Sequence, residues 1–477
     1  MCEQSSRPPP GGGCLLWLRL RHAAASKTFI RAILVTSFLI TGCSTTNRDW
    51  NQWRGPLRNG VVTDSPELAD TWPESGPDKI WESEPISSKR HGFGSVVVAG
   101  KKVYLFVSWR YQDPISLTAD LLRANAATVP SNVVTKLEEI ADVEFISADH
   151  IDDWIDLAGI SRSNKTEILS WIPEREFTVT DGVLCLDART GETIWRFEEP
   201  SLPTSFGTSS TPCVVDGRVY VLGSDADLYC LDADTGNKLW QKKLGSGETQ
   251  TSVAVTDGIV IAAVGPLTAL NASTGETLWI QENVPGTYSS PSIWRSEGNT
   301  YLLCNSKERL SCVHLADGVI AWTVPGGNHS STAVSGDHMA VFTGPGGLGL
   351  ALYRLSPHAA ELLWTVELPN KESSPLIYDG HVYAIGGGEA NCVDLATGEI
   401  RWQFETETDM TSPVVAGGKI YSAAIGTLTM IAPSPEKYTV MSRANLPIGR
   451  CVSPAISDGK LYMRMQTGVI CYDLTAR

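Results

Sequence analysis

The sequence is poor in features that mark several common functional classes. Its 38 lysines and arginines are outnumbered by 53 aspartates and glutamates, and the net charge at pH 7 is −15. A nucleic-acid-binding surface needs basic residues that neutralise phosphates, so this balance argues against a nucleic-acid partner. The sequence also contains no Cys-x-x-Cys and no Gly-x-Ser-x-Gly segment. Their absence argues against a zinc site and against the nucleophile turn of α/β hydrolases.

The apolar stretch near the N-terminus, residues 32–40, is too short to span a membrane as a helix. Lys27 and Arg31 come before it, and Thr41-Gly42-Cys43 follows it. A basic region, a short apolar core and small residues before a cysteine are typical of a bacterial lipoprotein export signal. We therefore predict a signal or leader segment over residues 1–42, lipidation of Cys43, and a flexible tether after it. The alternative is an uncleaved membrane anchor.

The eleven cysteines show no pattern of a disulfide framework. Five of them occupy one repeat position, which other repeats fill with Ala269 or Met430. That exchange indicates a compact apolar core position. Equivalent positions in different repeats are expected to lie too far apart for a disulfide. The five are Cys185, Cys230, Cys312, Cys392 and Cys471.

A repeat dominates the chain from about residue 180 onward. The pattern Asp-x-x-Thr-Gly, or a close variant, recurs with a tryptophan eight residues after its first position. A period of roughly 40 residues with short β-like runs is typical of a propeller built from four-stranded blades. The repeated residues are Asp187, Gly191 and Trp195; Asp232, Gly236 and Trp240; Asn271, Gly275 and Trp279; His314, Gly318 and Trp322; and Asp394, Gly398 and Trp402.

A second signal sets the number of blades. A Ser/Thr-rich start of an apolar strand, usually followed by a Tyr-containing strand, occurs eight times between residues 94 and 462. We therefore predict an all-β fold, an eight-bladed propeller of four-stranded antiparallel blades. Its channel mouth would be lined by serines that either bind a small polar ligand or hydrogen-bond the crowded inner backbone. These serines include Ser210, Ser290, Ser331, Ser374 and Ser412.

Three blades depart from the pattern. Blade five keeps Trp364 but has Ser356 at the Asp position, and blade seven has Ala432 there and Val440 where the tryptophan is expected. Blade eight lacks an outer strand because the chain stops at Arg477. The segment Lys79–Glu82, which contains Trp81, is predicted to supply that strand from the other end of the chain. Closing the ring in this way removes exposed sheet edges.

Each repeated residue has a physical role. The Asp and the Thr-Gly pair belong to the hairpin between the third and fourth strands, where a carboxylate accepts backbone N–H groups and glycine adopts positive φ. The tryptophan would lie on the outer strand between neighbouring blades. Truncating such a buried ring costs about 3–5 kcal/mol. A substrate-stacking array is the alternative interpretation of the tryptophans.

Residues 110–176 interrupt blade one. In the segment 149–158, Ile151, Trp154, Ile155 and Ala158 follow helical spacing on one face, and aspartates follow it on the other. Residues 113–176 hold 13 acidic and 5 basic residues. We predict a helical insertion that either docks a partner, covers one face of the ring, or is a solvated decoration. His150 beside Asp152 and Asp153 raises the alternative of a metal site.

The Asp-x-x-Thr-Gly-x-x-x-Trp pattern resembles the tryptophan-docking repeat of the pyrroloquinoline-quinone (PQQ)-like propeller family. That family contains quinoprotein alcohol dehydrogenases and the propeller lipoprotein of the outer-membrane β-barrel assembly machinery. The segment 49–60, Asp-Trp-Asn-Gln-Trp-Arg-Gly-Pro-Leu-Arg-Asn-Gly, resembles the opening of many exported bacterial members. The predicted organisation is thus a tether and lead-in over residues 43–78 and a propeller over residues 79–477.

The resemblance allows two functions. The quinoprotein dehydrogenases carry, as a family, an adjacent-cysteine disulfide, a calcium ion and an aspartate base. This chain has no adjacent cysteines, and no motif matches the calcium ligands or the base, so we expect no cofactor and no catalytic residues. The favoured function is a monomeric, lipid-anchored scaffold facing the periplasm that binds envelope or outer-membrane proteins. A dehydrogenase with PQQ and calcium, or another ligand-binding propeller enzyme, is the alternative.

Overall fold

The computed structural model describes residues 49–476 with short gaps. The gaps are residues 87–92, 112–114, 146–147, 173–177, 203–208, 248, 287, 307–308, 328, 344–348, 369–372, 407–409, 450–451 and 466–467. The predicted leader over residues 1–42 and Cys43 therefore lie outside the described residues. In the part of the chain that is described, no helix combines the length and apolar character needed to span a membrane.

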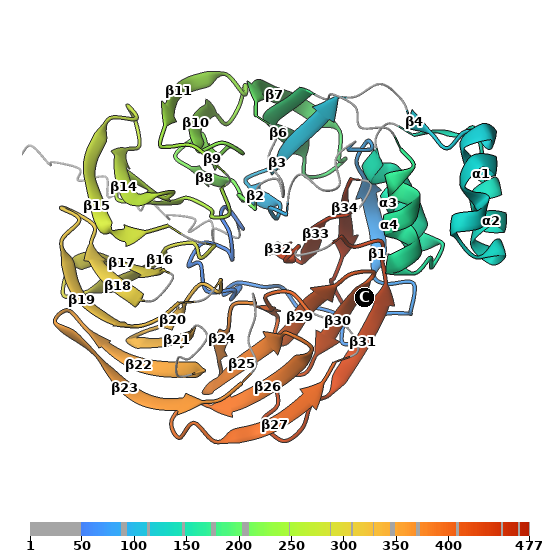
Figure 1. Cartoon of the computed structure of the whole chain (residues 1–477). Helices are drawn as coiled ribbons and strands as arrows, with labels where there is room; N and C mark the ends of the chain where they lie inside the picture. Colours follow the sequence, from blue (N-terminus) through green and yellow to red (C-terminus); the bar gives the residue numbers. More distant parts are fainter. Residues whose placement is uncertain are drawn as a thin grey trace, which may run out of the picture. The chain divides into compact units, whose positions relative to one another are not determined.

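Eight four-stranded antiparallel sheets form a ring of blades around a centre (Figure 1). The first strand of each blade lies innermost and the last outermost, which confirms the predicted eight-bladed propeller. Blades one to four are β2 (Val97–Ala99), β3 (Lys102–Tyr111), β6 (Thr178–Asp187) and β7 (Thr193–Ser201); β8 (Cys213–Val215), β9 (Arg218–Leu222), β10 (Asp227–Asp232) and β11 (Lys238–Lys243); β12 (Ala254–Thr256), β13 (Ile259–Ala263), β14 (Pro266–Asn271) and β15 (Thr277–Pro285); and β16 (Ser292–Ser296), β17 (Asn299–Asn305), β18 (Arg309–His314) and β19 (Ile320–Pro325). Blades five to eight are β20 (Ala333–Ser335), β21 (His338–Phe342), β22 (Leu350–Ser356) and β23 (Ala359–Val366); β24 (Leu376–Tyr378), β25 (His381–Gly386), β26 (Glu389–Asp394) and β27 (Ile400–Glu405); β28 (Val414–Ala416), β29 (Lys419–Ala424), β30 (Thr427–Ile431) and β31 (Val440–Asn445); and β32 (Ala455–Ser457), β33 (Lys460–Arg464), β34 (Val469–Asp473) and β1 (Asp78–Glu82).

The core lies between the blades. Middle strands such as β9 are buried on both faces, so they read as continuous apolar runs, whereas outer strands such as β7 alternate between exposed and half-buried residues. One apolar cluster joins Tyr104 and Cys185 of blade one to Val219 and Tyr229 of blade two, and similar clusters follow around the ring. Each sheet therefore buries both faces against its neighbours.

The N-terminal strand closes the ring as predicted. Strand β1 pairs with β34 in antiparallel register, with Trp81 opposite Cys471. Figure 1 shows this strand, in blue, beside the dark red strands of the C-terminal end. Because blade eight draws strands from both ends of the chain, the ring cannot open at this blade without breaking a sheet.

Blade seven corrects one prediction. Val440 was expected at the tryptophan position, but the residue paired with Met430 is Ser442, and Met430 is equivalent to the cysteines that pair with tryptophan elsewhere. The hairpin of this blade is longer, since the Ala432 N–H bonds the Thr439 carbonyl seven residues on, whereas the Asp394 N–H bonds the Glu399 carbonyl five residues on. Counting eight residues from Ala432 therefore stops two residues short.

A tryptophan from the lead-in replaces the one that blade seven lacks. Trp72 stacks on Tyr421 of β29 with ring centroids 6.0 Å apart, and the backbone N–H of Trp72 donates to the Ser442 hydroxyl. In blade eight, Trp81 lies at the same 6.0 Å from Tyr462. An indole ring thus lies against the equivalent tyrosine in blade seven as well, but its tryptophan comes from a distant part of the chain.

The insertion in blade one is helical, as predicted. It contains β4 (Ile115–Ser116), α1 (Ala119–Asn125), the 3₁₀ helix η1 (Ala126–Thr128), α2 (Ser131–Glu138), β5 (Glu144–Phe145), α3 (Ala148–Leu157) and α4 (Arg162–Ser170). Its apolar side chains form a cluster of their own, with Leu137, Ile151, Ile155 and Ile168 fully buried. The insertion therefore has a separate small core.

Candidate functional site

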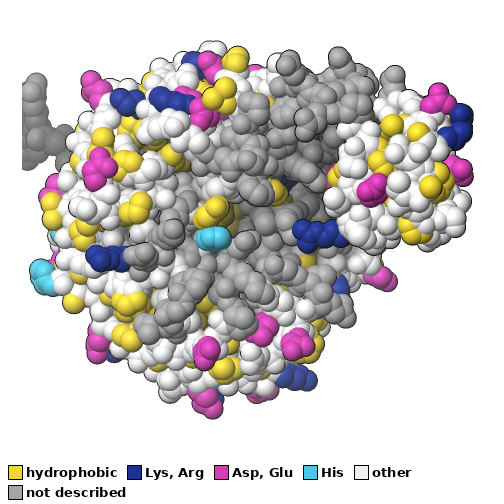
Figure 2. Space-filling model, in the orientation of Figure 1, with side chains coloured by type: hydrophobic (Ala, Val, Ile, Leu, Met, Phe, Trp, Pro, Cys, Tyr) yellow, Lys and Arg dark blue, Asp and Glu magenta, His cyan; other side chains and the backbone are white. Residues whose placement is uncertain are grey.

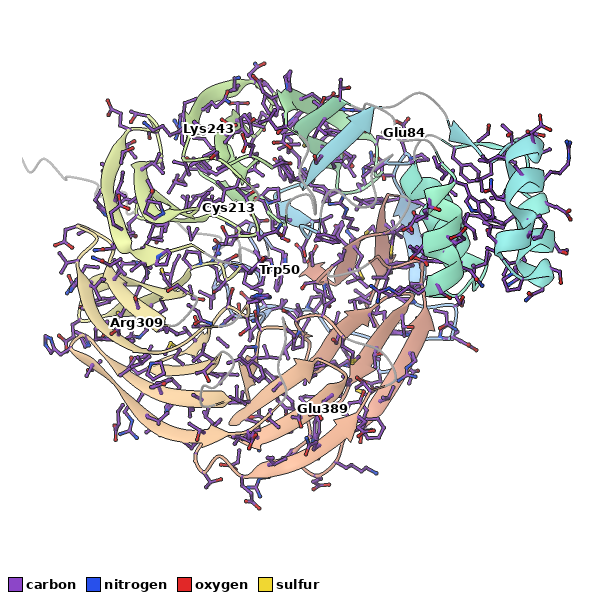
Figure 3. The ribbon with its side chains drawn as sticks, viewed as in Figure 1. Trp50, Glu84, Cys213, Lys243, Arg309 and Glu389 are labelled. Atoms are coloured by element: carbon purple, nitrogen blue, oxygen red, sulfur yellow. The ribbon has the colours of Figure 1, made fainter. Side chains whose placement is uncertain are left out.

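The centre of the ring holds a segment of the chain itself. Residues 50–62, named here the central segment, hydrogen-bond to the innermost strands of several blades. Backbone bonds join Trp50 to Val98 of blade one, Asn51 to Val214 of blade two, and both Gly60 and Val62 to Val415 of blade seven. Figure 3 shows Trp50 in the middle of the ring. Inner strands leave unpaired backbone groups facing a propeller channel, and the central segment satisfies part of them.

Two arginines of the central segment are fully enclosed. Arg54 and Arg58 expose 2% and 1% of their surface. Arg54 donates through Nη2 to the Pro375 carbonyl of blade six at 2.7 Å. Arg58 donates through Nε to the Pro291 carbonyl of blade four at 2.8 Å and through Nη1 to the Val253 carbonyl of blade three at 2.9 Å. The arginines thus tie blades three, four and six to the centre.

Both guanidinium groups are desolvated, and no described carboxylate forms an ion pair with either of them. Burial lowers the pKa of Arg54 to about 9 and that of Arg58 to about 10. Both remain positively charged at neutral pH. The side chain of Gln52 supports Arg58, since its Oε1 accepts the Arg58 Nη1 at 3.0 Å. The ring centre therefore holds two buried positive charges.

A girdle of hydroxyl groups surrounds the channel at the start of the innermost strands. The backbone N–H of one girdle residue donates to the hydroxyl of the next blade, at distances between 2.9 and 3.2 Å. The structure thus uses these hydroxyls as partners of the inner backbone. Ser210 lies outside the girdle, where its hydroxyl accepts the Leu222 N–H, and its neighbour Thr211 holds the girdle position. The residues of the girdle are Ser95, Thr211, Ser252, Ser290, Ser331, Ser374, Ser412 and Ser453.

The repeated tryptophans lie at the joints between blades. Each indole N–H donates to a backbone carbonyl of the following blade, at 2.7 to 3.2 Å. The rings also cover the hairpin glycines: a Cβ on Gly236, whose φ is +75°, would come within 2.6 Å of Trp195. The tryptophans therefore pack into the joints with their N–H groups engaged, which favours a structural role over substrate stacking. The bonded pairs are Trp81–Ala188, Trp195–Ala233, Trp240–Ala272, Trp279–Leu315, Trp322–Ser356, Trp364–Leu395 and Trp402–Ser434.

The motif aspartates hold the hairpins. Asp187 accepts the backbone N–H groups of the second and third residues after it, at 2.8 and 3.0 Å, and Asp232 does the same. These backbone bonds lower the pKa of Asp187. For Asp394 the hydrogen bond from Arg401 is the largest cause, and its pKa falls to about 2. Asn271 makes the equivalent bonds without a charge, so the geometry matters more than ionisation.

One buried carboxylate links blade one to blade two. Asp181 of β6 is fully enclosed and accepts three hydrogen bonds, from the Ser224 backbone N–H, the Ser224 hydroxyl and the Ser201 hydroxyl. Burial raises its pKa, and the bonds from Ser224 and Ser201 act in the opposite direction. It is the kind of perturbed acid that can mark a catalytic site. Here every named partner is a serine of the joint, which indicates a structural role.

This environment predicts a pH effect on Asp181→Asn. A raised folded pKa adds stability below the unfolded value, near 4, and this contribution is lost as pH rises through the folded pKa. The stability of wild type relative to Asp181→Asn should therefore fall as pH rises from about 4. Urea unfolding at several pH values measures it. Asp187→Asn is the control with the opposite sign. Because the pKa of Asp187 is lowered, the stability of wild type relative to Asp187→Asn should fall as pH drops below about 4. A pH-independent Asp181→Asn difference would contradict the assignment.

The described cysteines lie in the core, and a described aspartate of the insertion is engaged in an ion pair. All seven described cysteines, including the five at the shared repeat position, are free and buried, and burial raises the pKa of Cys185 to about 12. Asp152 of α3 pairs with Lys165 of α4 at 2.9 Å. Within the described ranges, no group of three His, Cys, Asp or Glu side chains is arranged to hold a metal ion. Figure 2 shows acidic and basic side chains scattered over the visible face.

The arginines at the ring centre were not predicted. The sequence marked residues 49–60 as a lead-in resembling other exported proteins, but assigned them no place. One signal could have drawn attention to them: residues 50–63 carry no other charge, and both arginines stand there among tryptophan, glycine and proline. Isolated charges in such a stretch are consistent with burial in a polar channel.

Comparison with known proteins places the chain among propellers of two functional kinds. A family model described as "Outer membrane protein assembly factor BamB" matches residues 180–325 and 306–475. The chain is 25% identical to the outer membrane protein assembly factor BamB of Yersinia pestis, over 58% of this chain and 66% of that protein. It is also 25% identical to the tetrathionate hydrolase of Acidithiobacillus ferrooxidans, over 60% of this chain and 69% of that protein. The matches thus span about two thirds of the length of these curated relatives.

The likeness to a solved structure extends over most of the chain. The crystal structure of the quinohemoprotein alcohol dehydrogenase from Comamonas testosteroni superposes with a TM-score of 0.56. The superposition covers 90% of this chain and 81% of the enzyme at 12% sequence identity. At that identity the likeness supports the fold alone.

Proposed function

The chain belongs to the outer membrane protein assembly factor BamB family of β-propellers, and from this premise we propose that it is a non-catalytic scaffold of the cell envelope. The observation that carries the proposal is the ring centre, which the central segment occupies. The blades then offer loops and surfaces to other proteins rather than a substrate channel.

The residues at the centre do not fit a calcium-bound quinone. Calcium needs several converging oxygen ligands, commonly carboxylates. Here two guanidinium groups face backbone carbonyls, and no described carboxylate pairs with either of them. Positive charge at this position opposes a divalent cation. The absence of adjacent cysteines in the sequence points the same way.

We place the protein at the periplasmic side of a membrane, held by lipid on Cys43, as a monomer that binds envelope or outer-membrane proteins. Similarity to outer membrane protein assembly factors supports a role in outer-membrane protein assembly. The export signal in the sequence supports the anchor. Both parts are proposals for this chain.

Affinity purification tests the scaffold. Tagged full-length chain is crosslinked in cells, and membranes are solubilised and analysed by mass spectrometry. We expect outer-membrane assembly proteins to be enriched over a sample tagged on an unrelated lipoprotein.

Cys43→Ser should move the protein from the membrane to the soluble fraction with an unchanged Tm. Dye reduction by the purified protein with PQQ, calcium and alcohols or sugars would favour the enzyme alternative instead.

The insertion can be tested separately, because the pairing of β3 with β6 shows where it can be removed while both strands are kept. Tyr111 of β3 lies directly opposite Thr178 of β6, so deleting residues 113–174 leaves a short hairpin between paired strands. The insertion's separate core suggests that the propeller folds without it. Loss of captured partners with an unchanged Tm would assign docking to the insertion. If the same partners are still captured, docking is assigned to the propeller loops.

A further inference from the structure

Among the described residues, no carboxylate pairs with Arg54 or Arg58 at the ring centre; Arg54 lies over the Trp53 ring at 5.7 Å. Desolvation lowers the pKa of both arginines. For Arg58, smaller electrostatic contributions from Cys213 and Cys304 act in the opposite direction. The acceptors of the two side chains among the described residues are neutral, either a backbone carbonyl or the Gln52 amide. Buried ions are costly unless paired.

Part of each guanidinium group has no acceptor in the portion of the chain that the structure describes. The unpartnered and enclosed nitrogens are Nε and Nη1 of Arg54 and Nη2 of Arg58. Guanidinium groups seldom lose their proton, so these donors keep their hydrogens and their need for an acceptor. Leaving such buried donors unpaired costs about 1–3 kcal/mol each, more when charged.

These donors flank one blade. Arg58 is held by blades three and four and Arg54 by blade six, which leaves blade five between them. At the repeat position where blades four and six have Pro291 and Pro375, blade five has Thr332. The Thr332 hydroxyl is buried and has no partner. Blade five thus adds a further donor at the same level of the ring.

We propose that a small monovalent anion, a halide such as chloride, binds at the ring centre between Arg54 and Arg58 beside Thr332. The anion accepts the remaining N–H groups and offsets one of the two buried charges. A guanidinium group binds carboxylates and oxyanions best through two adjacent N–H groups. In Arg54 the Nη2 nitrogen already donates to Asn59 and Pro375, and in Arg58 Nε and Nη1 are engaged. Neither guanidinium group therefore keeps an edge on which two neighbouring nitrogens can bind one ligand side by side, and the N–H groups that remain suit a monatomic anion.

Bromide diffraction is the direct test. Crystals of the protein grown with bromide in place of chloride should show an anomalous peak within hydrogen-bonding reach of Arg54 Nε or Nη1 and of Arg58 Nη2. A well-ordered centre without such a peak overturns the proposal. This measurement uses the wild-type protein, so it decides the matter even if the arginine variants fail to fold.

Thermal unfolding gives a second test in solution. Wild type should gain about 1.5 °C in Tm for each tenfold rise in chloride above its dissociation constant, at constant sodium with gluconate as the replacing anion. Arg58→Met should lose this dependence. Arg464→Met is the matched control, since Arg464 of β33 is also buried and donates to a backbone carbonyl outside the central segment, that of Phe106 in β3. Equal chloride dependence in wild type and Arg58→Met overturns the proposal.

Discussion

Replacing Trp81 by alanine is expected to lower the free energy of unfolding by about 3–5 kcal/mol. Trp81 is 7% exposed, and its indole N–H donates to the Ala188 carbonyl of blade one at 3.0 Å. Its ring also covers Gly191, where an added Cβ would come within 2.4 Å of the indole. The variant therefore loses apolar burial and leaves a carbonyl without its partner at the joint between the last blade and the first. Urea unfolding followed by circular dichroism measures the change.

The neighbouring residue provides the control. Ile80 lies in the same strand, β1, but is 42% exposed. Ile80→Ala should cost within about 1 kcal/mol, because it removes little buried surface. If Trp81→Ala were no more destabilising than Ile80→Ala, closure of the ring would not depend on the tryptophan joint.

Removal of the central segment is expected to have the largest effect on the propeller. A chain that begins at residue 63 loses eight of the described hydrogen bonds between residues 50–62 and the inner strands. At a net value of about 1 kcal/mol each, their loss is on the order of 5–10 kcal/mol, comparable with the whole stability of many proteins. We expect insoluble protein, or a Tm lowered by roughly 5–10 °C.

A shorter truncation separates this effect from loss of the leader. The described part of the chain begins at Asp49, so removal of residues 1–46 leaves every described contact in place. A chain that begins at residue 47 should keep the Tm of the full chain. Both truncations are compared by soluble yield and thermal unfolding. A folded propeller with full stability after removal of residues 1–62 would show that the inner strands need no central segment.

Much of the fold could be predicted because the repeat is a local signal. The Thr-Gly turn and the tryptophan are close in sequence, so their spacing places the hairpin and the outer strand of a blade before any long-range contact is known. The prediction is wrong in blade seven for the same reason. Its hairpin is two residues longer, so fixed spacing selects Val440 where the structure has Ser442. The compensating Trp72 comes from a segment with no repeat pattern.

The sequence by itself determined the number of blades, the closure of the ring by the strand containing Trp81, and the helical insertion. These features follow from periodicity and from a missing strand, which can be counted along the chain. Only the tertiary structure decided what occupies the centre. The channel is formed by eight strands that are far apart in sequence, and their free backbone groups become a binding surface only once the ring exists. For that reason no local pattern could place Arg54 and Arg58 there.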